Sequence, residues 1–249
     1  SLVGSEMCIR DRCGMHINCC NANGPRAFAL IPDFAVKKMG NEVYVNYYGD
    51  MSASLENGHN KVLVKQHTTY PVSNVIDITI DVTKENVFGL HLRVPVWSAQ
   101  TVITLNGEEL KDICPGTYHA ITRKWKKGDH IQIILDMPAR LLEQNQMQAI
   151  VRGPIVLARD SRFNDGFVDE TLVVDSEDGI VKAEVDSVPG FAWMRLKVPV
   201  TVGTDLEGVG MYRNISFCDF ASAGNTWDKQ VRYRVWIPRT LDVKKGHLK

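Results

Sequence analysis

The stretch Val75-Ile76-Asp77-Ile78-Thr79-Ile80-Asp81-Val82 alternates apolar and polar side chains without interruption. Alternation with a period of two is typical of a β-strand that buries one face and exposes the other. Similar strands are predicted at residues 42–47, 61–66, 88–94, 101–105, 118–122 and 130–135. Turn sequences separate them, and Asn106-Gly107 is the clearest hairpin signal. Short strands at this spacing predict a β-sandwich over residues 41–140.

A second β-rich segment is predicted over residues 141–249. Apolar runs that are typical of strands lie at residues 149–159, 171–174, 180–185, 193–198, 209–212, 215–217 and 231–237. Polar stretches at 160–170 and 220–229 read as loops. We therefore expect a mainly β protein with two β-sandwich, jelly-roll-like domains.

One helix is expected ahead of the strands, over residues 25–39. Asn23 is a candidate N-cap, Pro25 fits a first helical position, and Gly40 fits a C-terminal stop. Pro32 would kink this helix or divide it. Its expected buried side consists of Phe28, Ile31, Phe34 and Ala35.

Composition excludes several classes of function. The 249 residues carry 29 basic and 29 acidic side chains, and this balanced charge does not indicate binding to nucleic acid. No stretch has the length of a membrane span. The six cysteines, at 8, 13, 19, 20, 114 and 218, are irregularly placed, so we expect reduced thiols. Residues 1–12 resemble translated sequencing-adapter sequence, and we exclude them, with Cys8, from the prediction of the fold.

The adjacent pair Cys19-Cys20 carries the strongest chemical signal. It lies just before the predicted helix, where the helix dipole and free N–H groups favour a thiolate. A thiolate is both a nucleophile and a soft zinc ligand. The alternative is that both cysteines are small, inert packing residues. His16 has a spacing to Cys19 that could serve a metal, or it is simply a polar loop or strand residue.

Six short phrases, in order, resemble the bacterial β-L-arabinofuranosidases of glycoside hydrolase family 127. The first phrase contains the cysteine pair, and the others lie in the predicted strands and turns. The phrases are Cys19-Cys20-Asn21-Ala22-Asn23-Gly24-Pro25-Arg26, Gln66-His67-Thr68-Thr69-Tyr70-Pro71, Leu92-Arg93-Val94-Pro95-Val96-Trp97-Ser98, Leu105-Asn106-Gly107-Glu108, Arg123-Lys124-Trp125-Lys126-Lys127-Gly128-Asp129 and Arg152-Gly153-Pro154. The resemblance is strongest over residues 16–160 and weaker beyond them.

The resemblance implies a retaining glycosidase that acts on a carbohydrate substrate. It implies that Cys19 is the nucleophile and that Cys19 and Cys20 bind Zn²⁺. It also implies that residues 13–40 are the end of a catalytic (α/α) toroid. The remaining zinc ligands and the acid/base carboxylate would lie upstream, so the 249-residue chain alone is expected to be inactive.

The sequence departs from the family pattern at several positions. Asn21-Ala22 replaces two prolines, Val96 replaces a glycine, and Val72 stands where a tryptophan is common. These departures bear on the sugar and linkage that the protein recognises.

A different class of function stays open, namely a non-catalytic β-sandwich that binds carbohydrate or another partner. Its cysteines would then be structural. The five tryptophans, at 97, 125, 193, 227 and 236, could stack on sugars or fill the core, and Trp227, in a polar loop, is the best-placed candidate for stacking.

Overall fold

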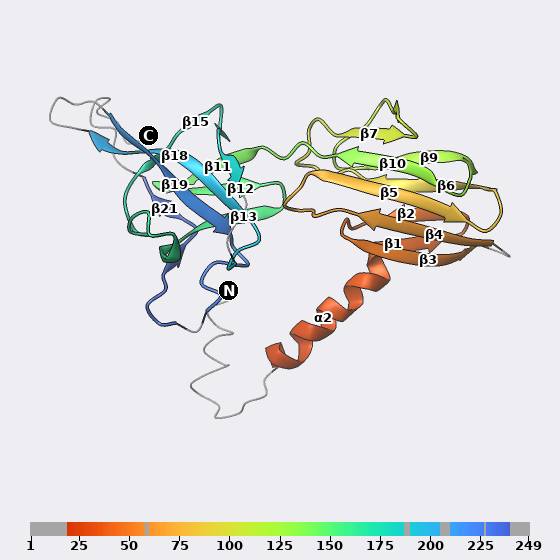
Figure 1. Ribbon diagram of the computed structural model, residues 1–249, viewed down its shortest axis with the longest axis horizontal. Helices are drawn as coiled ribbons and strands as arrows, with labels where there is room; N and C mark the ends of the chain where they lie inside the picture. Colours follow the sequence, from red (N-terminus) through yellow and green to blue (C-terminus); the bar gives the residue numbers. More distant parts are fainter. Residues whose placement is uncertain (1–18, 58–59, 187–189, 205–209, 227, 240–249) are drawn as a thin grey trace. The chain divides into compact units, whose positions relative to one another are not determined.

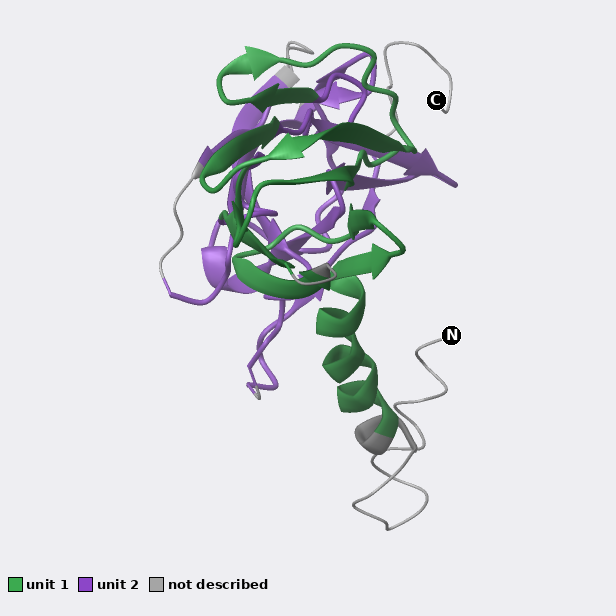
Figure 2. Ribbon diagram, turned by 90° about the vertical axis from the view of Figure 1, so that its right-hand side faces the viewer, with its two compact units in different colours: residues 1–68, 76–96, 102–133 green, residues 69–75, 97–101, 134–249 purple. Residues whose placement is uncertain are grey.

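The computed structural model describes residues 19–57, 60–186, 190–204, 210–226 and 228–239 (Figure 1). The chain divides into two compact units (Figure 2). Unit 1 consists of Ser1–Thr68, Ile76–Val96 and Val102–Ile133, and unit 2 consists of Thr69–Val75, Trp97–Thr101 and Ile134–Lys249. The described residues contain a single α-helix, α2, and many strands, which confirms the mainly β prediction.

Unit 1 contains two sheets. The four-stranded sheet has the order β1-β2-β6-β9, with β2 and β6 parallel and the other pairs antiparallel. Its strands are β1 (Val36–Met39), β2 (Glu42–Val45), β6 (Asn86–Arg93) and β9 (Tyr118–Trp125). The six-stranded sheet has the order β3-β4-β5-β10-β7-β8. Its strands are β3 (Met51–Asn57), β4 (Asn60–His67), β5 (Val75–Val82), β10 (Asp129–Ile134), β7 (Val102–Leu105) and β8 (Glu108–Glu109).

The core of unit 1 comes from the inward-facing positions of these strands. Ile78 and Ile80 of β5 and Leu90 and Leu92 of β6 are all fully buried. Trp125 is buried as well, and its indole N–H donates to the carbonyl of Phe88 at 3.0 Å. Alternate side chains along each strand thus point into the core and away from it, as the period of two in the sequence predicts.

Unit 2 is a single connected sheet in which β14-β18-β19-β13-β12-β11-β16-β15 form the main path. Strand β17 pairs with β18, β20 with β13, and β21 with β12. The elements are β11 (Ala139–Gln144), β12 (Met147–Arg152), β13 (Ile155–Asp160), the 3₁₀ turn η1 (Ser161–Phe163), β14 (Val173–Val174), β15 (Ser176–Glu177), β16 (Ile180–Val181), β17 (Glu184–Asp186), β18 (Arg195–Thr204), β19 (Gly210–Asp219), β20 (Tyr233–Arg234) and β21 (Ile237–Pro238). Both ends of the path share one core, because Val181 packs in the same cluster as Leu196 and Phe217.

The helix differs from its predicted position. Helix α2 runs from Cys19–Ala35, with Pro25 and Pro32 inside it, so Asn23 is not its N-cap. Residues 36–39, predicted as its last turn, form β1 and pair with β2. Pairing with β2 therefore holds residues 36–39 in a strand, although their local sequence pattern is compatible with a helix. Gly40, predicted as the helix stop, has φ +60° and lies in the turn between β1 and β2.

The predicted buried side of the helix is wrong for three of its four residues. Phe28, Ile31 and Phe34 are 72%, 44% and 49% exposed, and only Ala35 is buried. Within the described part of unit 1, the ammonium group of Lys37 lies over the Phe34 ring, 4.9 Å from its centroid, and leaves about half of that side chain exposed. By contrast, the predicted Asn106-Gly107 hairpin is confirmed, because these two residues join β7 to β8 with positive φ angles.

Candidate functional site

The predicted site residues Cys19 and Cys20 are the first two residues of α2. Their backbone lies in the first helical turn, where free N–H groups and the helix dipole favour an anion. Their side chains lie outside the described part of the structure, as do Cys13 and His16. Helix α2 therefore includes the pair instead of following it, and this backbone position favours a thiolate.

The other end of the helix is fixed to the four-stranded sheet by Asn46, which follows β2. Its backbone N–H donates to the carbonyl of Ala35 at 2.8 Å, and its side-chain amide donates to the carbonyl of Phe34 at 2.7 Å. The amide oxygen of Asn46 accepts from the hydroxyl of Tyr118 at 2.6 Å. Carbonyls that end a helix have no partner within it, so these bonds both satisfy them and orient α2.

Beyond this anchor, α2 presents an apolar surface to solvent. We use the name apolar helix face for Phe28, Leu30, Ile31 and Phe34, which are 44–72% exposed. A helix with this surface is stabilised in proteins mainly by packing against a neighbour. The helix that carries the cysteine pair thus leaves large apolar side chains exposed beyond its anchored end.

Several of the phrases that led to the family resemblance have structural roles. Asp129 accepts from the backbone N–H of Lys126 at 2.8 Å and from the side-chain amide of Asn106 at 2.9 Å. The amide oxygen of Asn106 in turn accepts from the N–H of His130 at 2.8 Å. Two turns that are far apart in the sequence are thereby fixed together.

A similar contact joins two other phrases within unit 2. Arg152 donates from one guanidinium nitrogen to the carbonyls of Pro71 and Val72, at 3.2 and 3.1 Å. Burial lowers the pKa of Arg152. These contacts fix the 69–75 segment against β12, so Arg152 positions the backbone of that segment.

The remaining described thiols do not form a site. Cys114 is exposed and Cys218 is fully buried. Burial raises the pKa of the Cys218 thiol to about 12, so it stays protonated and unreactive at neutral pH.

Among the residues that the structure describes, no group of three or more His, Cys, Asp or Glu side chains is placed to hold a metal ion. No described helix is long and apolar enough to cross a bilayer.

The described tryptophans differ in exposure, and the sequence did not indicate which of them would be exposed. Trp125 is in the core, and Trp227, the preferred stacking candidate, lies outside the described residues. Trp193, just before β18, is 74% exposed. No local signal in the sequence marks it, because Asp219, at the end of β19, and Ser222, which hold its backbone, lie far from it along the chain.

Comparison with known proteins identifies the segment that forms most of unit 1. Residues 42–137 match the family model described as beta-L-arabinofuranosidase, GH127 middle domain. No curated protein matches the sequence.

Solved structures share the fold of the chain over nearly its whole length. One titled glycoside hydrolase has a TM-score of 0.74 at 22% identity over 92% of this chain. A GH127 beta-arabinofuranosidase has a TM-score of 0.72 at 22% identity over 89% of the chain. A GH127 beta-L-arabinofuranosidase from Geobacillus stearothermophilus has a TM-score of 0.72 at 18% identity over 94% of it.

These proteins are longer than the present chain, which covers 40%, 38% and 41% of their respective lengths. At such identities the structural matches establish the fold, and the family model establishes the kind of domain. The resemblance noted in the sequence is thereby confirmed: residues 42–137 match the middle domain of glycoside hydrolase family 127, within a chain that has the fold of solved members of that family.

Proposed function

We propose that this chain is the C-terminal part of a retaining glycoside hydrolase that acts on L-arabinofuranosides or related plant-glycan sugars. The observation that carries the proposal is the placement of Cys19-Cys20 in the first turn of a helix that is anchored, through Asn46, to the family 127 middle domain. The predicted toroid segment 13–40 is shortened in this proposal, because residues 36–39 form β1. The end of a catalytic helical toroid is then the segment up to Ala35, and the apolar helix face packs against the rest of that toroid.

Cys19 is proposed as the nucleophile. Its thiolate attacks the anomeric carbon, the bond from that carbon to the leaving oxygen breaks, and the leaving oxygen takes a proton from an acid. Water then attacks the same carbon, returns the electron pair to sulfur and gives its proton to the conjugate base of that acid, so the configuration is retained. The position of the pair at the helix N-terminus favours the thiolate that this step requires.

Zn²⁺ is the proposed cofactor, with Cys19 and Cys20 as two of its ligands. The donor set fits, because two thiolates are ligands that zinc prefers. When bound, zinc would keep the cysteines deprotonated at neutral pH. Zinc sites in proteins use three or four protein ligands, so the other ligands and the acid/base are proposed to lie upstream of the pair. A polypeptide limited to residues 1–249 is accordingly proposed to be inactive.

The test uses a protein in which these residues are joined to their upstream sequence. We expect it to contain zinc by elemental analysis and to hydrolyse an aryl β-L-arabinofuranoside. Cys19→Ser should lower kcat by about a thousandfold or more, since it removes the nucleophile. Cys114→Ser changes an exposed thiol and is the matched control, with activity unchanged. Full activity in Cys19→Ser would overturn the proposed role.

The second candidate function is a non-catalytic sandwich that binds carbohydrate. The exposure of Trp193 favours it, because aromatic side chains in a binding site stack on sugar rings. It predicts no hydrolysis even with the upstream sequence present, and no effect of Cys19→Ser on any binding. The two candidates are therefore separated by the same experiment.

A further inference from the structure

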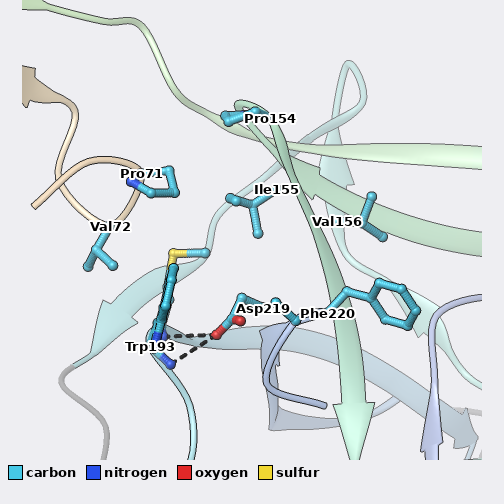
Figure 3. A pocket seen from close by; sticks show the side chains of 10 residues that line it. Pro71, Val72, Pro154, Ile155, Val156, Trp193, Asp219 and Phe220 are labelled. Carbon is cyan, nitrogen blue, oxygen red and sulfur yellow. Dashed lines mark hydrogen bonds between the residues drawn. The ribbon is translucent and has the colours of Figure 1, made fainter. Parts of the chain in front are cut away.

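Unit 2 contains a cavity of about 230 Å³ with Trp193 on one side of it (Figure 3). Val72, Ile155 and Phe220 also line it. All of these residues belong to unit 2, so the cavity lies within one compact unit. Its walls are almost wholly hydrocarbon and aromatic, because Asp219 is the only ionisable residue among them.

The backbone of Trp193 is held firmly although its side chain is 74% exposed. Its N–H donates to Oδ2 of Asp219 at 3.0 Å and to Oγ of Ser222 at 3.2 Å. The next N–H, of Met194, donates to the same carboxylate oxygen at 3.2 Å. Asp219 is only 4% exposed, and its other oxygen accepts from the N–H of Ser222 at 2.9 Å. Both oxygens of the carboxylate are thus used to fix this loop.

A second set of contacts holds the loop from its other side. The carbonyl of Phe191 accepts from the side-chain amide of Asn225 at 3.0 Å. The guanidinium of Arg162 lies over the Phe191 ring, 4.0 Å from its centroid. Arg162 is in turn paired with Asp160, whose carboxylate is fully buried. Two buried carboxylates therefore fix a loop that presents one tryptophan to solvent.

An exposed indole with a fixed backbone loses little conformational freedom when a ligand stacks on it. The cavity beside it offers apolar contact and no unused carboxylate oxygen. This suits the C–H face of a sugar ring, whose hydroxyl groups can stay in contact with water. We propose that Trp193 and the adjoining cavity form a carbohydrate-binding site for a pentose residue of the glycan.

The choice of a sugar as the occupant rests on the proposed function. The competing occupant is an apolar side chain of another protein, which would suit the same walls. The two are distinguishable, because a sugar site binds a free glycoside in solution and a site for apolar side chains prefers a small apolar molecule.

The test is a titration of the full chain, labelled with ¹⁵N at tryptophan, while the five indole signals are followed by NMR. Trp193→Phe identifies the signal of Trp193 by its loss. With methyl β-L-arabinofuranoside we expect saturable shifts of this signal, with a Kd of roughly 1–10 mM. Cyclohexanol at the same concentrations serves as the apolar probe and should give a smaller shift.

Two variants remove the site by different routes. Trp193→Ala deletes the stacking surface, and Val72→Trp fills the cavity without removing any group of the loop. For Trp193→Ala, binding is followed by changes in the ligand's own signals. Trp193→Ala and Val72→Trp should each weaken binding of the glycoside by about tenfold or more. Phe167→Ala alters a side chain that is 85% exposed and does not line the cavity, so its Kd should stay within about twofold of the parent.

Binding that is unchanged in Val72→Trp would overturn the proposal even if Trp193→Ala failed to fold. So would the absence of any saturable shift up to roughly 100 mM glycoside, or a shift of the Trp193 signal with cyclohexanol that is as large as the shift with the glycoside or larger. None of these results depends on Cys19. A failure of the proposed catalytic function is therefore seen separately, as an absence of hydrolysis with sugar binding intact.

Discussion

On strand β6, Leu90 and Leu92 are both fully buried, whereas on helix α2 Phe28 and Phe34 are 72% and 49% exposed. Both segments have amphipathic sequences, and both belong to unit 1. Strand β6 has its neighbours within the chain, in β2 and β9, whereas the helix is hydrogen-bonded to the sheet region at its last turn. An apolar pattern therefore predicts a buried face without showing which partner buries it.

The largest expected effect is in the core of unit 1. Leu90→Ala should lower the free energy of unfolding by about 2–5 kcal/mol, because it leaves a cavity at a fully buried site. Urea denaturation followed by tryptophan fluorescence measures this. Phe28→Ala is the matched change on the helix, and its effect should stay within about 0.5 kcal/mol. Equal losses in the two variants would break the comparison.

A somewhat smaller effect is expected at Asp160, in the loop network of unit 2. Burial alone would raise the pKa of this carboxyl, but hydrogen bonds from Arg162 and from the N–H of Gly224 lower it below its usual value. Asp160→Asn should cost about 2–3 kcal/mol at pH 7, because it leaves Arg162 without its charged partner.

The lowered pKa also sets the sign of a pH dependence. The stabilisation by ionised Asp160 is complete above its unfolded pKa of about 4 and is lost as the pH falls through the folded pKa. The difference in unfolding free energy between the parent and Asp160→Asn should therefore shrink at acid pH. Denaturation curves at several pH values test this, and a difference that grows toward low pH would contradict the assignment.

The junction between helix and sheet should give a smaller effect still. Asn46→Ala removes the side-chain bonds to the Phe34 carbonyl and from Tyr118. We expect a loss of about 1 kcal/mol and faster amide hydrogen exchange in α2, with exchange in β5 unchanged. Unaltered exchange in α2 would mean that the helix is held by other contacts.

The smallest change in stability is expected on the apolar helix face. Replacing Phe28 and Ile31 together by serine should alter the unfolding free energy by no more than about 0.5–1 kcal/mol. It should, however, reduce self-association of the chain in sedimentation velocity runs, because exposed apolar patches associate. Self-association that is unchanged in this variant would mean that the chain associates through another surface.

Much of the fold was predictable because alternation along a strand is a local signal. The run at residues 75–82 matches β5, and Asn106-Gly107 forms the expected hairpin. The helix boundaries were not predictable in this way. Residues 36–39 join a ladder with β2, and that pairing depends on a partner strand instead of on local propensity.

The candidate site was predictable only in part. The sequence placed Cys19-Cys20 at a helix entrance, and the structure places them in the first turn. It did not single out Trp193, whose backbone is held by Asp219 and Ser222 from another part of the chain. Side-chain exposure of this kind is a tertiary property that no period in the sequence encodes.

We propose, above all, that α2 belongs to a larger helical domain whose active site contains Cys19. The most direct measurement is to sequence the source DNA upstream of the Cys13 codon. We expect an open reading frame that continues for several hundred residues with helical periodicity and that contains glutamate and cysteine residues able to complete a zinc site. A genuine start codon just before Cys13 would contradict the claim and would favour a β-sandwich module with two packing cysteines.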